Sequence, residues 1–99
     1  MTRAGYVYIL ASQQNGTLYI GVSASPARRL AQHRAGSGSR FARRHGATRL
    51  VYIERHERIA DAIAREKAMK AWKRAWKIAL IERVNPGWHD LRRELFDLP

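Results

Sequence analysis

The sequence contains no cysteine, which excludes disulfide bonds and thiolate metal sites and leaves packing to hold the fold together. Long apolar stretches are also missing, since the longest uninterrupted run, residues 78–81, is far too short to cross a bilayer. No repeat or low-complexity tract divides the 99 residues, of which 45% are hydrophobic, enough for one modest core. We therefore expect a single domain over residues 1–99, in a soluble cytoplasmic protein with no membrane partner and no obligate protein partner.

Acidic residues are scarce as well. The chain has 8 Asp and Glu against 19 Lys and Arg, a formal net charge of +11. The basic residues are spread along the chain, and such a surface attracts polyanions, with nucleic acid favoured strongly over an anionic membrane. The alternative is that the charge serves solubility alone.

A β-hairpin is predicted near the N-terminus. Residues 6–10 and 17–22 are rich in β-branched and aromatic side chains, and Asn15-Gly16 between them is a typical hairpin turn. With Asn15 and Gly16 as the two central turn residues, Tyr8 is predicted to face Ser23.

The two faces of this hairpin differ in chemistry. One is aliphatic and is predicted to be core, whereas the other carries Tyr8, Tyr19 and Gly21. The glycine leaves room above the sheet, as a polar cleft requires. The alternative is an ordinary solvated face with half-buried tyrosines.

Residues 26–35 are expected to form a helix, because Ser25-Pro26 is typical of a helix start and Gly36 of a helix end. Arg29 and His33 are four residues apart on it, so their side chains lie one turn apart on the same face. The glycine-punctuated basic segment 36–47 is interpreted as a phosphate-contacting loop, and residues 48–55 as a third, antiparallel strand.

A second helix is predicted over residues 59–72, with apolar residues on one face at Ile59, Ala62, Ile63 and Met69. Glu66 falls in the middle of this face, where a carboxylate must be paired or must coordinate an ion. A rotated apolar stripe predicts a break near Lys73-Arg74, and Asn85-Pro86-Gly87 ends the next helix. The expected fold class is α+β, a small three-stranded antiparallel sheet flanked by about three helices in the order β-β-α-β-α-α.

In this order and spacing, the residues resemble the GIY-YIG endonuclease family, particularly its small stand-alone bacterial branch. The signature tripeptides of the family match residues 6–8 and 19–21, the first with Tyr6 for the leading glycine and Val for Ile. The family's catalytic arginine, eight residues after the second signature, matches Arg29, and a histidine four residues later matches His33. Its metal-binding glutamate matches Glu66, so the resemblance covers roughly residues 6–85.

The resemblance implies a metal-dependent endonuclease that hydrolyses phosphodiester bonds in DNA, with Mg²⁺ or Mn²⁺ held by Glu66. Arg29 is then expected to bind the scissile phosphate, and Tyr19 to activate the attacking water, with Tyr8 alongside and His33 orienting or sharing the proton. A phenol, with a reference pKa of about 10, is a weak base at neutral pH unless nearby cations favour its ionised form, so His33 is the alternative base.

The family's late asparagine matches Asn85, for which ending a helix is an equally good explanation. Further basic residues are expected to contact phosphates without reading sequence: Arg40, Arg43, Arg44, Arg49, Lys67 and Lys70. We therefore expect structure selectivity or low sequence specificity, with DNA repair as the setting. The tryptophans, at positions 72, 76 and 88, are expected in the core rather than as base-stacking platforms.

Two other functions stay open on the sequence. The first is a non-catalytic basic module that binds nucleic acid, and the second is an RNA- or ribosome-associated protein.

Overall fold

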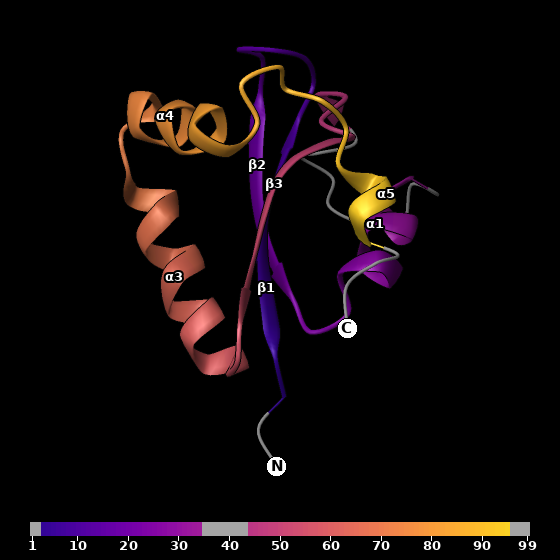
Figure 1. The fold of residues 1–99 in the computed structure, drawn as a ribbon, viewed down its shortest axis with the longest axis vertical. Coiled ribbons are helices and arrows are strands. Elements are labelled where there is room, and N and C mark those ends of the chain that lie inside the picture. The colour runs from indigo at the N-terminus through magenta and orange to yellow at the C-terminus, as the bar shows by residue number, and fades with distance from the viewer. Residues whose placement is uncertain (1–2, 35–43, 96–99) are drawn as a thin grey trace.

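The computed structural model describes residues 3–34 and 44–95 of the chain. They form a three-stranded antiparallel sheet in the order β2-β1-β3, with helices on both faces. Helices α3 and α4 cover one face and α1 and α5 the other (Figure 1). The α+β class and the order of elements are confirmed. The elements are β1 (Gly5–Ala11), β2 (Leu18–Ser23), α1 (Pro26–Arg34), β3 (Arg49–His56), α3 (Ile59–Ala71), α4 (Arg74–Val84) and α5 (Arg92–Leu95).

The hairpin register differs by two residues from the predicted one, because Tyr8 faces Gly21 rather than Ser23. The cause is a longer turn: the Ser12 amide donates to the Thr17 carbonyl at 3.0 Å, and the Thr17 amide donates to Ser12 Oγ at 2.9 Å. Residues 13–16 therefore form the loop. A shift of two preserves the alternation of side chains, so the composition of each face is as predicted.

The aliphatic face of the sheet is the larger core, as predicted. Val7 and Ile9 are fully buried there, in one cluster with Ala62 and Met69 of α3 and with residues of α4. Ile63, expected to share this face, is 40% exposed. The buried arc of α3 is centred between Ile59 and Met69, which leaves Ile63 at its margin.

The tyrosine face is a second core rather than an open polar face. Tyr8 and Leu10 are each 1% exposed and cluster with Leu30 of α1, Leu50 of β3 and Leu95 of α5. The one-turn helix α5 brings the C-terminal segment back over this face. Helices α1 and α5 therefore cover most of the Tyr8 side chain.

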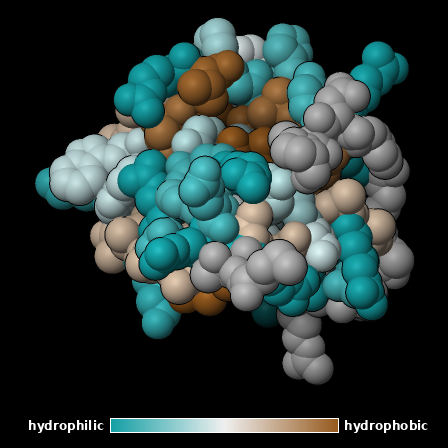
Figure 2. Space-filling model, turned by 60° about the horizontal axis from the view of Figure 1, so that its bottom comes forward, coloured by the Kyte–Doolittle hydropathy of each residue, from teal (hydrophilic) through white to brown (hydrophobic). Residues whose placement is uncertain are grey.

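The break between α3 and α4 is confirmed, since Trp72 and Lys73 are both extended. Arg74 anchors the start of α4 on the hairpin turn by donating to the carbonyl oxygens of Asn15 and Gly16 at 2.7 and 2.6 Å. Hydrophilic residues dominate most of the described surface seen in Figure 2. None of the helices within residues 3–34 and 44–95 could serve as a membrane span.

Candidate active site

Tyr8 lies at the centre of the predicted site, on the middle strand β1. Its ring lies over Gly21 of β2, where an added Cβ would be only 2.5 Å from both Cζ and Oη of the phenol. Any side chain at position 21 would therefore occupy the space of the phenol. The second signature's glycine is explained by this close approach.

Arg29 lies in α1, the helix that follows β2 after a short turn, and its side chain reaches the Tyr8 phenol. The Ser25 amide donates to Ser23 Oγ at 2.9 Å, and the first turn of α1 closes with the Arg29 amide bonded to the Ser25 carbonyl at 3.0 Å. The Arg29 guanidinium hydrogen-bonds the side chain of Tyr8 and also donates to Gln32 Oε1 at 3.3 Å. The positive charge of Arg29 is thus held beside the Tyr8 phenol.

Glu66 is contributed by α3. Its side chain is 13% exposed, and Oε2 lies 3.2 Å from Lys70 Nζ. Its charge is close enough to Tyr8 to raise the pKa of the phenol. The carboxylate is partly buried, as its place on the helix predicted, and it is paired with a lysine whose own side chain is 54% exposed.

Burial raises the pKa of Tyr8 to about 12, and the neighbouring Tyr19 and the Glu66 carboxylate act in the same direction, against the Arg29 hydrogen bond and charge. Tyr8 is therefore a protonated phenol at neutral pH, a hydrogen-bond donor rather than a base. Tyr19, half-buried on β2, lies near enough to contribute to this shift. Four predicted residues from four elements are accordingly brought together: Tyr8, Tyr19, Arg29 and Glu66.

The other predicted residues stand differently. His33 lies in α1, but its side chain is outside the described residues, as are Arg40 and Arg43 entirely. Arg44, Lys67 and Lys70 are exposed. Arg49 is partly buried and donates to the Trp88 carbonyl at 3.3 Å.

Asn85 ends α4 and is 5% exposed. Its Nδ2 donates to the carbonyls of Val51 and His89 at 3.0 and 2.9 Å, and its Oδ1 accepts from the His89 amide at 3.1 Å. The side-chain amide thus joins α4, β3 and the C-terminal segment. Ending the helix, the alternative role considered for this asparagine, is what the backbone shows.

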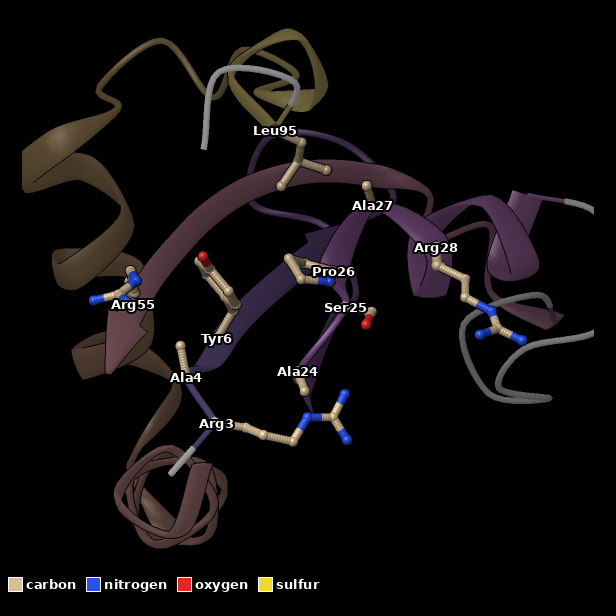
Figure 3. Close-up of a pocket in the computed structure, with 10 residues that line it drawn as sticks. All are labelled: Arg3, Ala4, Tyr6, Ala24, Ser25, Pro26, Ala27, Arg28, Arg55 and Leu95. Atoms are coloured by element: carbon tan, nitrogen blue, oxygen red, sulfur yellow. The ribbon is translucent and has the colours of Figure 1, made fainter. Parts of the chain in front are cut away.

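A basic pocket of about 490 Å³ was not foreseen from the sequence. It is lined by Tyr6 and by Arg3, Arg28 and Arg55, beside the start of α1. Figure 3 places Tyr6 and Arg55 on one side of Pro26 and Arg28 on the other. These arginines are far apart in sequence, and the pairing of Tyr6 with Arg55 across β1 and β3, which helps to bring them together, is set by the tertiary structure.

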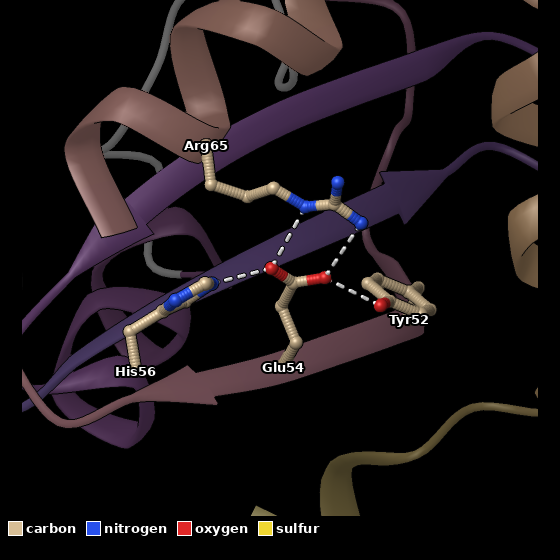
Figure 4. A network of polar contacts seen from close by, with 4 residues as sticks. All are labelled: Tyr52, Glu54, His56 and Arg65. Atoms are coloured by element: carbon tan, nitrogen blue, oxygen red, sulfur yellow. Dashed lines mark hydrogen bonds and ion pairs between the residues drawn. The ribbon is translucent and has the colours of Figure 1, made fainter. Parts of the chain in front are cut away.

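A polar network on the opposite face of the sheet was also missed. Tyr52 Oη donates to Glu54 Oε1 at 2.5 Å, His56 Nε2 lies 2.5 Å from Oε2, and Arg65 donates to both carboxylate oxygens (Figure 4). Burial alone would raise the pKa of Glu54, but the three hydrogen-bonding partners outweigh burial and lower it. The network fixes α3 to β3 at the residue before Glu66. Its signal was the alternation of Tyr52, Glu54 and His56 along one strand.

The donor set fits one divalent cation held by a single carboxylate. Among the described residues, no group of three His, Cys, Asp or Glu side chains could hold a metal. Mg²⁺ commonly keeps several waters and takes only one or two protein carboxylates, with substrate phosphate completing its shell. Lys70 pairs with Glu66 at i,i+4, and because the lysine side chain is 54% exposed, it can move away when a divalent cation binds the carboxylate.

Comparison with known proteins identifies the family of this chain. The model of the GIY-YIG catalytic domain matches residues 4–79. A UPF0213 protein of Pseudomonas aeruginosa is 40% identical over 75 residues, 76% of this chain and 71% of the relative. One from Natronomonas pharaonis is 37% identical over 76 residues, 77% of this chain and 88% of the relative.

The fold has a solved counterpart. The solution NMR structure of a UPF0213 protein from Bacillus halodurans is similar with a TM-score of 0.55 and 28% identity, covering 88% of this chain and 92% of that one. With the family model matching most of the chain, this protein belongs to the GIY-YIG family of nucleases, alongside the small UPF0213 proteins.

Proposed function

We propose that the protein is a divalent-metal-dependent endonuclease that hydrolyses phosphodiester bonds in DNA, either selecting DNA structure or acting with low sequence specificity. The proposal is supported by the hydrogen bond of Tyr8 with Arg29, by the packing of its ring over Gly21, and by its electrostatic interactions with Tyr19 and Glu66. A phosphate at this point would meet a guanidinium and a protonated phenol, with a carboxylate beside them. The net charge of +11 supports an anionic substrate.

Arg29 is assigned to the scissile phosphate. A planar, permanently charged guanidinium can pair with two phosphate oxygens and stabilise the charge that develops on them. Tyr8, protonated at neutral pH, donates a hydrogen bond to a phosphate oxygen or to the attacking water. Its hydrogen bond with Arg29 keeps the two donors in a fixed relation.

Glu66 is assigned to the metal, in place of its contact with Lys70. A bound Mg²⁺ or Mn²⁺ would supply Lewis-acid stabilisation of phosphate oxygen charge and would make a water more acidic. Lys70, released by the exchange, is exposed and free to approach the substrate backbone.

The attacking water must lose a proton as the new P–O bond forms and the bond to the leaving sugar oxygen breaks. Tyr19 and His33 remain the two candidate bases, since Tyr8 is held protonated. Asn85 is proposed to act by positioning the chain, because both its donor and acceptor atoms bind backbone groups.

The decisive experiment is cleavage of single-stranded, duplex and branched DNA by the purified protein, with and without Mg²⁺. We expect Glu66→Gln to abolish cleavage, to keep DNA binding, and to weaken Mn²⁺ binding measured by calorimetry. Glu57→Gln, the same change at an exposed glutamate, is the matched control and should cleave normally. Cleavage that persists in Glu66→Gln or in excess chelator would refute the metal assignment.

Salt-sensitive binding without cleavage of any substrate would instead favour a non-catalytic binding module, for which the charge alone is sufficient. Arg29→Ala separates the two functions. A nuclease should lose about 10²–10³-fold in rate, whereas a simple binder should lose only part of its affinity.

A further inference from the structure

A groove of about 520 Å³ lies at the junction of α3 and α4, and none of Tyr8, Tyr19, Arg29 and Glu66 lines it. It is lined by Arg65, Trp72, Trp76, Ala79, Leu80 and Arg83. In Figure 1, α3 and α4 lie across the sheet from α1, the helix that carries Arg29. The groove combines aromatic and cationic side chains, and its volume is within the range of ligand sites.

The two tryptophans of this groove have different surroundings. Trp72 packs against the larger core, and the Arg65 guanidinium lies over its ring, 4.9 Å from the centroid. Trp76 is 55% exposed and meets Trp72 edge to face, with centroids 6.3 Å apart and an angle of 72° between the planes. The expectation that all three tryptophans are core residues is therefore wrong for Trp76. Trp72 therefore packs against the Trp76 ring, which remains largely exposed to solvent.

Cations surround this exposed indole. Lys73 Nζ lies 5.9 Å from the Trp76 ring centroid, and Arg83, two helical turns along α4, is exposed. Residues 65–84 contain seven basic and two acidic side chains. Both acids are engaged, Glu66 by Lys70 and Glu82 by Trp88 Nε1 at 2.9 Å. Of the two arginines that line the groove, Arg65 is paired with Glu54 and Arg83 is exposed, so Arg83 and Lys73 supply the positive charge beside the aromatic surface.

We propose that this groove binds an unpaired stretch of nucleic acid, with one base stacked on Trp76 and the adjoining phosphates contacted by Lys73 and Arg83. Stacking on an indole requires a base with an uncovered face. Bases inside an intact duplex have both faces covered by their neighbours, whereas an unpaired base can expose one. Backbone cations beside an aromatic ring are the combination used for single strands. That the ligand is a nucleic acid rests on the proposed function. The inference adds that the substrate contains a single-stranded segment.

The test measures binding of a fluorescein-labelled oligothymidylate of about ten nucleotides by anisotropy, in chelator so that cleavage does not intervene. Trp76→Ala should weaken binding about tenfold or more, the effect of losing one base–aromatic stack, and Trp76→Phe should recover most of it. The slope of affinity against salt should stay the same for both, because no phosphate contact is removed. Arg83→Ala should instead reduce that slope by about one.

Val84→Ala is the matched control, since Val84 is 61% exposed on the same helix beside Arg83. It should bind like the wild type. Inorganic polyphosphate, which has no bases, is the second probe, and Trp76→Ala should bind it normally. Because Trp76 is exposed, its variants should fold, which circular dichroism verifies.

Several results would overturn the inference. One is that Trp76→Ala binds the oligothymidylate as tightly as Val84→Ala does. Another is that Trp76→Ala loses as much affinity for polyphosphate as for the oligothymidylate. Sedimentation showing a dimer that Trp76→Ala dissociates would assign the groove to a second copy of the chain, and tighter binding of oligoglutamate than of oligothymidylate would assign it to acidic peptides. An inactive protein whose binding depends on Trp76 would refute the nuclease proposal alone.

Discussion

Replacing Gly21 by alanine gives a direct test of the site geometry. The added methyl would be 2.5 Å from Cζ and Oη of Tyr8, about 1 Å or more inside the ordinary contact distance of ~3.5–4.0 Å. Tyr8 is 1% exposed and has little room to retreat. In an unobstructed strand the same change would stabilise the fold by about 0.5–1 kcal/mol, because glycine loses more backbone entropy on folding.

Overpacking of this kind typically costs about 1–3 kcal/mol, so Gly21→Ala should lower the free energy of unfolding by about 1–2 kcal/mol. The expected change in the free energy of unfolding is therefore opposite in sign to the change expected in an unobstructed strand. Displacing the phenol by about 1 Å should also reduce the cleavage rate as much as a hundredfold. Urea unfolding measures the first quantity and single-turnover cleavage the second.

A double-mutant cycle supplies the control. Tyr8→Leu removes all three atoms that the new methyl would strike, Cζ, Oη and Cε2, so Gly21→Ala made in that background should leave stability unchanged or increase it. An equal destabilisation in both backgrounds, or a stabilised single mutant, would refute the steric argument.

Two further predictions concern stability. Burial raises the pKa of both Tyr8 and Tyr52 to about 12, so the folded state holds these protons more tightly than the unfolded state; their stabilisation is complete below about pH 10 and is lost as the pH rises towards 12. Between pH 8 and pH 11 the wild type should therefore lose about 1 kcal/mol more unfolding free energy than Tyr52→Phe, and equal losses in denaturant titrations would contradict this. Asn85→Ala breaks three hydrogen bonds to Val51 and His89 and should destabilise the fold by about 2–4 kcal/mol. Its cleavage rate per folded molecule should match the wild type, whereas a stable but inactive Asn85→Ala would indicate a catalytic role.

Much of the fold follows from local signals. The alternation in residues 6–10, the helix start at Ser25-Pro26 and the change of apolar stripe near Lys73 predicted elements that the structure confirms. Each signal depends on a few consecutive residues and on backbone chemistry that acts over one or two turns. The hairpin register was missed because Ser12 and Thr17 close a longer loop than the turn dipeptide suggested.

The site was predicted from motif spacing and from the family resemblance. In the structure Tyr19, Arg29 and Glu66 are all near enough to Tyr8 to affect its pKa, and their roles stay predictions. Composition could not reveal the protonation state of Tyr8. That state depends on burial beneath α1 and α5, and the covering residues come from distant parts of the chain.

The sequence by itself determined the elements, their order and the residue types available for phosphate chemistry, since these depend on periodicity, turn chemistry and charge. Tertiary structure alone decided that the tyrosine face became a second core, that three distant arginines share a pocket, and that Trp76 stays in solvent while Trp88 is buried. The physical reason is that burial depends on which element packs onto which face. Those long-range contacts are not encoded in any local pattern of side chains.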